Sequence, residues 1–104
     1  MDYFLVYATA SSEEEATNIA RTAVEERLAA CANVIEKSKS IYWWEREIQT
    51  ATESLVILKT TNKNLGSLID RVKQIHSYDC PCVVALQIQN GNKDFLNWIT
   101  KEMK

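Results

Sequence analysis

Residues 32–49 read ANVIEKSKSIYWWEREIQ, and this stretch decides how the rest of the chain is arranged. It is rich in β-branched and aromatic side chains, and neither Gly nor Pro interrupts it, so it favours one long strand. If all 18 residues are extended at ~3.3 Å each, the strand spans roughly 60 Å. A globule of this chain length, with a radius of gyration near 13 Å, is only about 33 Å across. We therefore expect the strand to project beyond its own body.

This strand is expected to form one arm of a hairpin. The polar residues 50–53 are expected to turn the chain, and residues 55–58, Leu-Val-Ile-Leu, to form the returning strand. Strands with exposed aromatic side chains and free edges pair readily with other chains. The hairpin therefore predicts contacts between identical subunits in a closed ring. A bend at residues 38–40 would instead fold the aromatic side chains back onto the monomer.

The segment before the hairpin predicts a strand followed by a helix. Residues 3–9 form a short, nearly continuous apolar run, which is typical of a buried strand. Ser11 and Ser12 precede Glu14 and Glu15 at the spacing of a capping box, which marks the start of a helix. Apolar residues then recur at helical spacing and extend this amphipathic helix to about Ala30.

The segment after the hairpin predicts a helix, a strand and a terminal helix. Residues 65–75 have helical spacing, with Asn62 or Asn64 as the expected cap. A strand over residues 83–88 follows Pro81, and Asn92 is expected to cap the last helix. The order β-α-β-β-α-β-α predicts an α+β fold: a ferredoxin-like βαββαβ sandwich with an additional C-terminal helix, in a single domain of residues 1–104.

Composition narrows the class of protein. The chain of 104 residues is 46% hydrophobic and 25% charged, as in an ordinary soluble globule. Its formal net charge is -2 and its Lys and Arg residues form no cluster, which argues against nucleic-acid and membrane partners. No apolar run approaches the ~18–20 residues of a membrane helix, and the N-terminus lacks the basic segment of a signal peptide. Three cysteines, an odd number, indicate free thiols and a cytoplasmic location.

Five blocks of sequence, in order, resemble the CutA divalent-cation-tolerance family. They are residues 26–33 (ERLAACAN), 40–45 (SIYWWE), 58–61 (LKTT), 76–81 (HSYDCP) and 91–99 (GNKDFLNWI). The resemblance covers nearly the whole chain. It implies a ferredoxin-like fold, a homotrimer similar to the PII signalling proteins, and a role in tolerance to divalent cations, copper above all. It implies no enzyme activity.

Two segments depart from the family pattern. After Trp44-Glu45 the family usually continues Gly-Lys, whereas this chain has Arg46-Glu47. The family motif His-Pro-Tyr-Glu-x-Pro-Glu is here HSYDCPC, residues 76–82, so the Pro after His is lost and the last acidic residue is replaced by a cysteine.

A metal site is the first functional candidate. Cys80 and Cys82 are two apart, so on an extended strand their side chains point the same way, and His76 lies just upstream. One imidazole and two thiolates suit copper, as Cu(I), or another cation such as Zn²⁺. The alternative is that both cysteines are small buried hydrophobes and that His76 only ends a helix. Cys31, in an apolar stretch, is expected in the core.

A cleft between subunits is the second candidate. Trp44, Glu45, Lys59 and Tyr78 lie in blocks that match the family and could bind a small, anionic effector, as in a PII-like regulator. Lys59 could equally be a solvated strand end or part of a salt bridge. A structural or partner-binding scaffold is a further alternative. Catalysis is not expected, because His76 is the only histidine and no glycine-rich phosphate loop exists.

Overall fold

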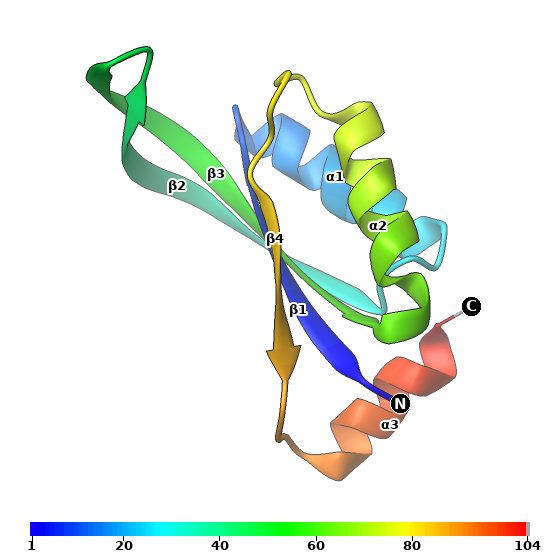
Figure 1. The fold of residues 1–104 in the computed structure, drawn as a ribbon. Helices are drawn as coiled ribbons and strands as arrows, with labels where there is room; N and C mark the ends of the chain where they lie inside the picture. Colours follow the sequence, from blue (N-terminus) through cyan, green and yellow to red (C-terminus); the bar gives the residue numbers. More distant parts are fainter. Residues whose placement is uncertain (104) are drawn as a thin grey trace.

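The computed structural model describes residues 1–103 and has the predicted order of elements. The sheet has the order β2-β3-β1-β4, with every neighbouring pair antiparallel. Helices α1 and α2 cover one face of the sheet, and α3 lies at its end, near the start of β1 (Figure 1). This is the expected ferredoxin-like arrangement. The elements are β1 (Tyr3–Ala10), α1 (Glu13–Glu25), β2 (Cys31–Trp44), β3 (Glu47–Thr61), α2 (Asn62–Ile75), β4 (Val83–Ile88) and α3 (Lys93–Glu102).

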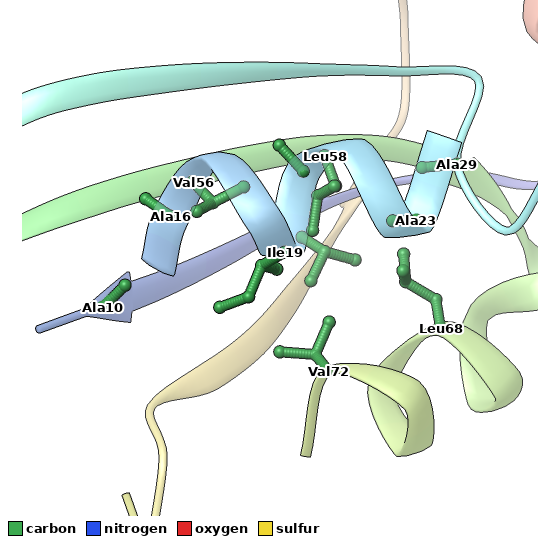
Figure 2. Packing of buried hydrophobic residues seen from close by; sticks show 11 residues of the cluster. Ala10, Ala16, Ile19, Ala23, Ala29, Val56, Leu58, Leu68 and Val72 are labelled. Carbon is green, nitrogen blue, oxygen red and sulfur yellow. The ribbon is translucent and has the colours of Figure 1, made fainter. Parts of the chain in front are cut away.

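The core lies between the sheet and the two covering helices. Alternate residues of β1 and β3 point toward the helices, and small alanines on α1 let that helix approach the sheet closely (Figure 2). Burying a Val, Leu or Ile side chain stabilises the fold by roughly 1.5–3 kcal/mol. The largest fully buried aliphatic residues of this cluster are Val6, Ile19, Val56, Leu58, Leu68 and Val72.

The ends of α1 show one correct and one wrong prediction. The Ser12 hydroxyl accepts the Glu15 N–H at 3.1 Å, and Glu15 accepts the Ser11 N–H at 2.9 Å, so the predicted capping is confirmed. The helix ends at Glu25 rather than near Ala30. Arg27 adopts a left-handed conformation (φ 59°), and the Leu28 N–H bonds back to the carbonyl of Ala23 at 2.9 Å. The sequence does not indicate this helix end, because Arg27 stands where a left-handed residue after a helix is usually Gly.

The caps of the other two helices also differ in how well they were predicted. Thr61 is the N-cap of α2, so the expectation of Asn62 or Asn64 is wrong; Asn62 is the first helical residue. The Thr61 hydroxyl donates to the Asn64 side-chain oxygen at 3.3 Å. Asn92 caps α3 as predicted, because its side chain accepts the N–H of Asp94 at 2.9 Å.

The hairpin turns at Glu45 and Arg46, not at residues 50–53. Both residues are left-handed, with φ of 49° and 69°. Residues 50–53 instead lie inside β3, where Glu53 pairs with Ser38 and Thr50 with Ile41. The prediction failed because a left-handed two-residue turn is normally marked by Asn or Gly, whereas here a Glu and an Arg adopt it. β3 is therefore longer than expected.

A β-bulge in β2 decides which aromatic side chains share a face. The register shifts between Ile35 and Ser38, and the Ser54 hydroxyl donates to the Glu36 carbonyl at 2.5 Å within the bulge. Beyond it, even-numbered residues of β2 lie on the face of Gln49 and Glu53. Because directly paired residues share a face, Tyr42 and Trp44 lie on that side, while Ile41 and Trp43 lie on the other.

The hairpin extends past the body of the chain, as predicted. The molecule measures 44 × 25 × 22 Å, and the paired ends of β2 and β3 extend away from the helices (Figure 1). Trp43 is 71% exposed, and Ile41 is also exposed. The alternative in which a bend at residues 38–40 folds these side chains onto the monomer is therefore wrong for Ile41 and Trp43.

The sheet face opposite α1 and α2 is apolar, and neither of these two helices covers it (Figure 1). Helix α3 reaches it only at the end of the sheet, where the Tyr3 hydroxyl lies 2.6 Å from that of Thr100. The strand register places Tyr7 beside Ile57 and Val84, and Leu5 beside Leu86. Leu86 is 64% exposed, and Val84 is also exposed. We call this surface, formed by Leu5, Tyr7, Ile57, Val84 and Leu86, the open face. It leaves a large apolar area on one chain without a partner.

Candidate functional site

A cleft of about 550 Å³ lies where the hairpin, β1 and the loop between α2 and β4 meet. β1 and β3 supply residues near the middle of the sheet, β2 supplies two aromatic side chains beyond the bulge, and the loop supplies the rest. The lining contains aromatic rings, carboxylates and thiols, and no Lys, Arg or His. The residues are Tyr7, Thr9, Tyr42, Trp44, Glu53, Tyr78, Asp79, Cys80 and Cys82.

Tyr78 and Glu53 form the polar centre of the cleft. The Tyr78 hydroxyl donates a hydrogen bond to Oε2 of Glu53 at 2.9 Å, although Glu53 is only 8% exposed. Burial and this hydrogen bond together raise the pKa of Tyr78 to about 12. Tyr78 therefore keeps its proton at neutral pH and holds the Glu53 carboxylate in place.

His76 fixes the loop rather than facing the cleft. Its side chain is 0% exposed. Nε2 lies 2.7 Å from the carbonyl oxygen of Thr9, and Nδ1 accepts the N–H of Tyr78 at 3.1 Å. These contacts fit the tautomer with its proton on Nε2, because a carbonyl can only accept. The imidazole also packs against the Tyr78 ring, with centroids 4.7 Å apart. His76 thus ties the backbone of Tyr78 to β1, with one ring nitrogen on each.

Glu15 ties the same loop to the start of α1. Its carboxylate accepts hydrogen bonds from the N–H and hydroxyl of Ser11, both at 2.9 Å, and from the N–H of Ser77 at 2.8 Å. Burial acts to raise the pKa of Glu15, but these hydrogen bonds prevail and lower it to about 2. Glu15 therefore stays charged at neutral pH and anchors the loop that carries Tyr78.

The three predicted metal ligands have different surroundings: Cys80 and Cys82 line the cleft, and His76 does not. Cys80 and Cys82 both line the cleft and are exposed, so the alternative that they are buried hydrophobes is wrong. Burial of the thiol, followed by the charge of Glu53, raises the pKa of Cys82. Within residues 1–103, no group of three or more His, Cys, Asp or Glu side chains is arranged to hold a metal. His76, Cys80 and Cys82 are thus not assembled as one site in a single chain.

Cys31 does not have the predicted core position. It is half-buried at the start of β2 and lies outside the core cluster. Its register partner is Lys59, far along the sheet from the loop of Cys80. Cys31 is therefore distant in the fold from the other two thiols.

Two of the four predicted effector-binding residues meet in the cleft. Trp44 and Tyr78 both line it. Lys59 does not; its ammonium donates to the side-chain oxygen of Asn33 at 2.8 Å on the neighbouring strand. Glu45 lies in the hairpin turn and is exposed. Within one chain, the structure does not bring Lys59 or Glu45 to the other two.

Sequence reasoning missed the residue at the centre of the cleft. Glu53 was assigned to a turn because it ends the polar run 50–53, whereas it lies buried within β3. Tyr7 was assigned to a buried strand, and its side chain in fact lines the cleft. The available signal was the apolar run that begins at Leu55, two residues after Glu53.

The family model for the CutA1 divalent ion tolerance protein matches residues 4–102. This chain belongs to the CutA1 family. It is 43% identical over 99 residues to the divalent-cation tolerance protein CutA of Archaeoglobus fulgidus, covering 95% of this chain and 96% of that protein. It is 41% identical to the chloroplastic CutA 1 of rice (Oryza sativa subsp. japonica), covering 91% of this chain and 54% of that longer protein.

The fold comparison agrees with the family match. A solved structure of CutA from Archaeoglobus fulgidus superimposes with a TM-score of 0.94 at 42% identity, covering 98% of this chain and 99% of that one. That protein is described as periplasmic and the rice relative as chloroplastic, so a cytoplasmic location stays a prediction for this chain. No helix within residues 1–103 is long and apolar enough to cross a membrane. The predicted CutA resemblance is confirmed, and divalent-ion tolerance is the property for which the family is named.

Proposed function

We propose that this CutA1 family member is a cytoplasmic homotrimer that contributes to copper tolerance by binding the ion with Cys80 and Cys82. The observation that carries this proposal is that both thiols are exposed and line the same cleft. They follow directly on a loop that Glu15 and His76 hold in place. Ligands on a fixed loop lose less conformational freedom when they bind an ion.

The donor chemistry favours copper over hard cations. Thiolates are soft ligands and select Cu(I) or Zn²⁺, whereas Mg²⁺ and Ca²⁺ prefer oxygen. Burial and the charge of Glu53 raise the pKa of Cys82, so the metal must displace a proton that is held firmly. Binding should therefore weaken as the pH falls. His76 could join as a third ligand only by giving up a hydrogen bond, so the two thiols are the primary ligands.

Two surfaces support the homotrimer. The open face is apolar and partly exposed on one chain, and the hairpin carries Ile41 and Trp43 beyond the body. A closed ring of identical subunits would remove both surfaces from water and satisfy the free edge of β2. All three cysteines are free, in accord with a reducing compartment.

A competition titration tests the metal assignment. Cu(I) is distributed between the protein and a chromophoric chelator under anaerobic conditions. We expect one copper per chain for the wild type, and binding weaker by at least about tenfold for the Cys80→Ser, Cys82→Ser double variant. Cys31→Ser is the matched control, because it removes a thiol outside the cleft. Unchanged binding by the double variant would refute the ligand assignment.

A further inference from the structure

The hairpin has an apolar side that faces away from the cleft. Residues alternate along β2, so Lys39, Ile41 and Trp43 lie together, on the side opposite Trp44. Ile48 of β3 pairs directly with Trp43 and shares that side. The three apolar side chains, Ile41, Trp43 and Ile48, are exposed on one chain and lie outside the lining of the cleft. We call them the hairpin patch.

A second apolar feature lies on α3. Phe95 and Trp98 are one helical turn apart, and their rings stack with centroids 5.5 Å apart. Ile99, next to Trp98, is fully buried against its own chain, whereas Phe95 is 41% and Trp98 is 38% exposed. We call Phe95 and Trp98 the helix patch. The stacked pair presents a continuous aromatic surface that one chain leaves partly in water.

The hairpin patch cannot reach the helix patch of its own chain. α3 lies near the start of β1, where the Tyr3 hydroxyl is 2.6 Å from that of Thr100. The hairpin lies at the other end of the sheet, and the molecule is 44 Å long (Figure 1). Only a second copy of the chain can therefore bring the two patches together.

Two different patches at opposite ends of a chain fit a head-to-tail contact. In a ring of identical subunits, one surface of each subunit meets a different surface of the next. The hairpin patch and the helix patch are such a pair, because each subunit can use both at once, one toward each neighbour. Repeating the contact from subunit to subunit closes a ring when the rotation between neighbours allows it.

The charges beside the two patches are complementary. Lys39 is exposed and lies two residues before Ile41, on the side of the hairpin patch. Asp94 is exposed in the first turn of α3, four residues before Trp98, and so lies on the same side of the helix. Neither charge takes part in an ion pair among residues 1–103. Opposite charges at the rim of an apolar contact fix its register.

We propose that the hairpin patch of one subunit packs on the helix patch of the next, and that Lys39 pairs with Asp94 across this contact. The contact rests on the homotrimer of the proposed function and specifies which surfaces meet in it. Aromatic side chains are enriched at the centres of protein interfaces, and both patches supply them. The contact uses no residue of the cleft lining.

A charge-swap series, measured by sedimentation from nanomolar to micromolar concentration, tests the contact. Lys39→Glu and Asp94→Lys each place like charges face to face at every interface of the ring, so each should raise the trimer dissociation constant at least about tenfold. The double variant restores opposite charges and should return to within about threefold of the wild type. Lys73→Glu and Asp70→Lys, both exposed on α2, are the matched controls and should leave the constant unchanged.

Carbodiimide coupling tests the same pair directly, because it joins an amine to a carboxylate without a spacer. In the wild type we expect a product of two chains that contains a peptide linking Lys39 to Asp94. In an intact trimer, absence of this link, single variants without effect, or a double variant that does not recover would each overturn the contact and leave the homotrimer standing. A wild-type chain that stays at 11.9 kDa would overturn both.

Discussion

The anchoring carboxylate of Glu15 yields the sharpest stability prediction. Its pKa lies at about 2, against an ordinary value of 4.5, and each unit of difference corresponds to about 1.4 kcal/mol. The shift gives an upper bound of roughly 3.4 kcal/mol, which we discount to about 2–3 kcal/mol because the side chain is 13% exposed. Since the folded state lowers this pKa, the stabilisation is complete above pH 4.5 and is lost as the pH falls toward 2.

Glu15→Gln removes the charge but keeps one oxygen to accept either Ser11 or Ser77. At pH 7 the variant should unfold with a free energy about 2–3 kcal/mol lower than that of the wild type, and near pH 2 the two should nearly coincide. Urea titrations followed by tryptophan fluorescence at both pH values measure the difference. Hydrogen exchange should also quicken at the Ser77 N–H, which loses a charged acceptor.

Glu14→Gln is the matched control, because Glu14 is exposed on the same turn of α1. It should change the free energy of unfolding by less than about 0.5 kcal/mol at either pH. A difference between wild type and Glu15→Gln that stays constant from pH 7 to pH 2 would refute the reasoning. Such a result would mean that packing, not the charge on Glu15, stabilises this junction.

Three further predictions follow from single features. Arg46→Gly should raise the free energy of unfolding by about 1 kcal/mol in urea titration, because Arg46 has a φ of 69°; an unchanged or lower value contradicts this. Leu86→Asp should leave the chain folded by circular dichroism but lower its sedimentation coefficient, because the residue is exposed on one chain; an intact assembly argues against burial of the open face. Glu53→Gln should quicken alkylation of Cys82 by iodoacetamide, since burial and then the charge of Glu53 raise the pKa of that thiol. Peptide mass spectrometry measures the alkylation rate, with Cys31 as the internal control. A slower rate at Cys82 excludes the charge of Glu53 as a cause of the raised pKa.

The periodicity of the sequence predicted the elements better than their ends. Apolar patterns over β1, α1 and β4 report which side chains are buried, and the observed order follows from them. The wrong boundaries share one cause. Arg27, Glu45 and Arg46 adopt left-handed conformations, and none of them is the Gly or Asn that normally signals such a position.

The cleft was only partly predictable because it depends on register. Trp44 and Tyr78 were chosen from motif similarity, and they do meet. Glu53 was missed because the turn was expected at residues 50–53 instead of 45–46, which made a buried strand residue look like a loop residue. The bulge at Glu36 has no mark in the local sequence, yet it decides which tryptophan faces the cleft.

Assembly is the central claim of this account, because the open face and the hairpin are left without partners on an isolated chain. Sedimentation equilibrium at micromolar concentration tests it most directly. We predict a single species of three chains of 11.9 kDa each, or about 36 kDa. A species of 11.9 kDa that persists throughout the concentration range would contradict the claim.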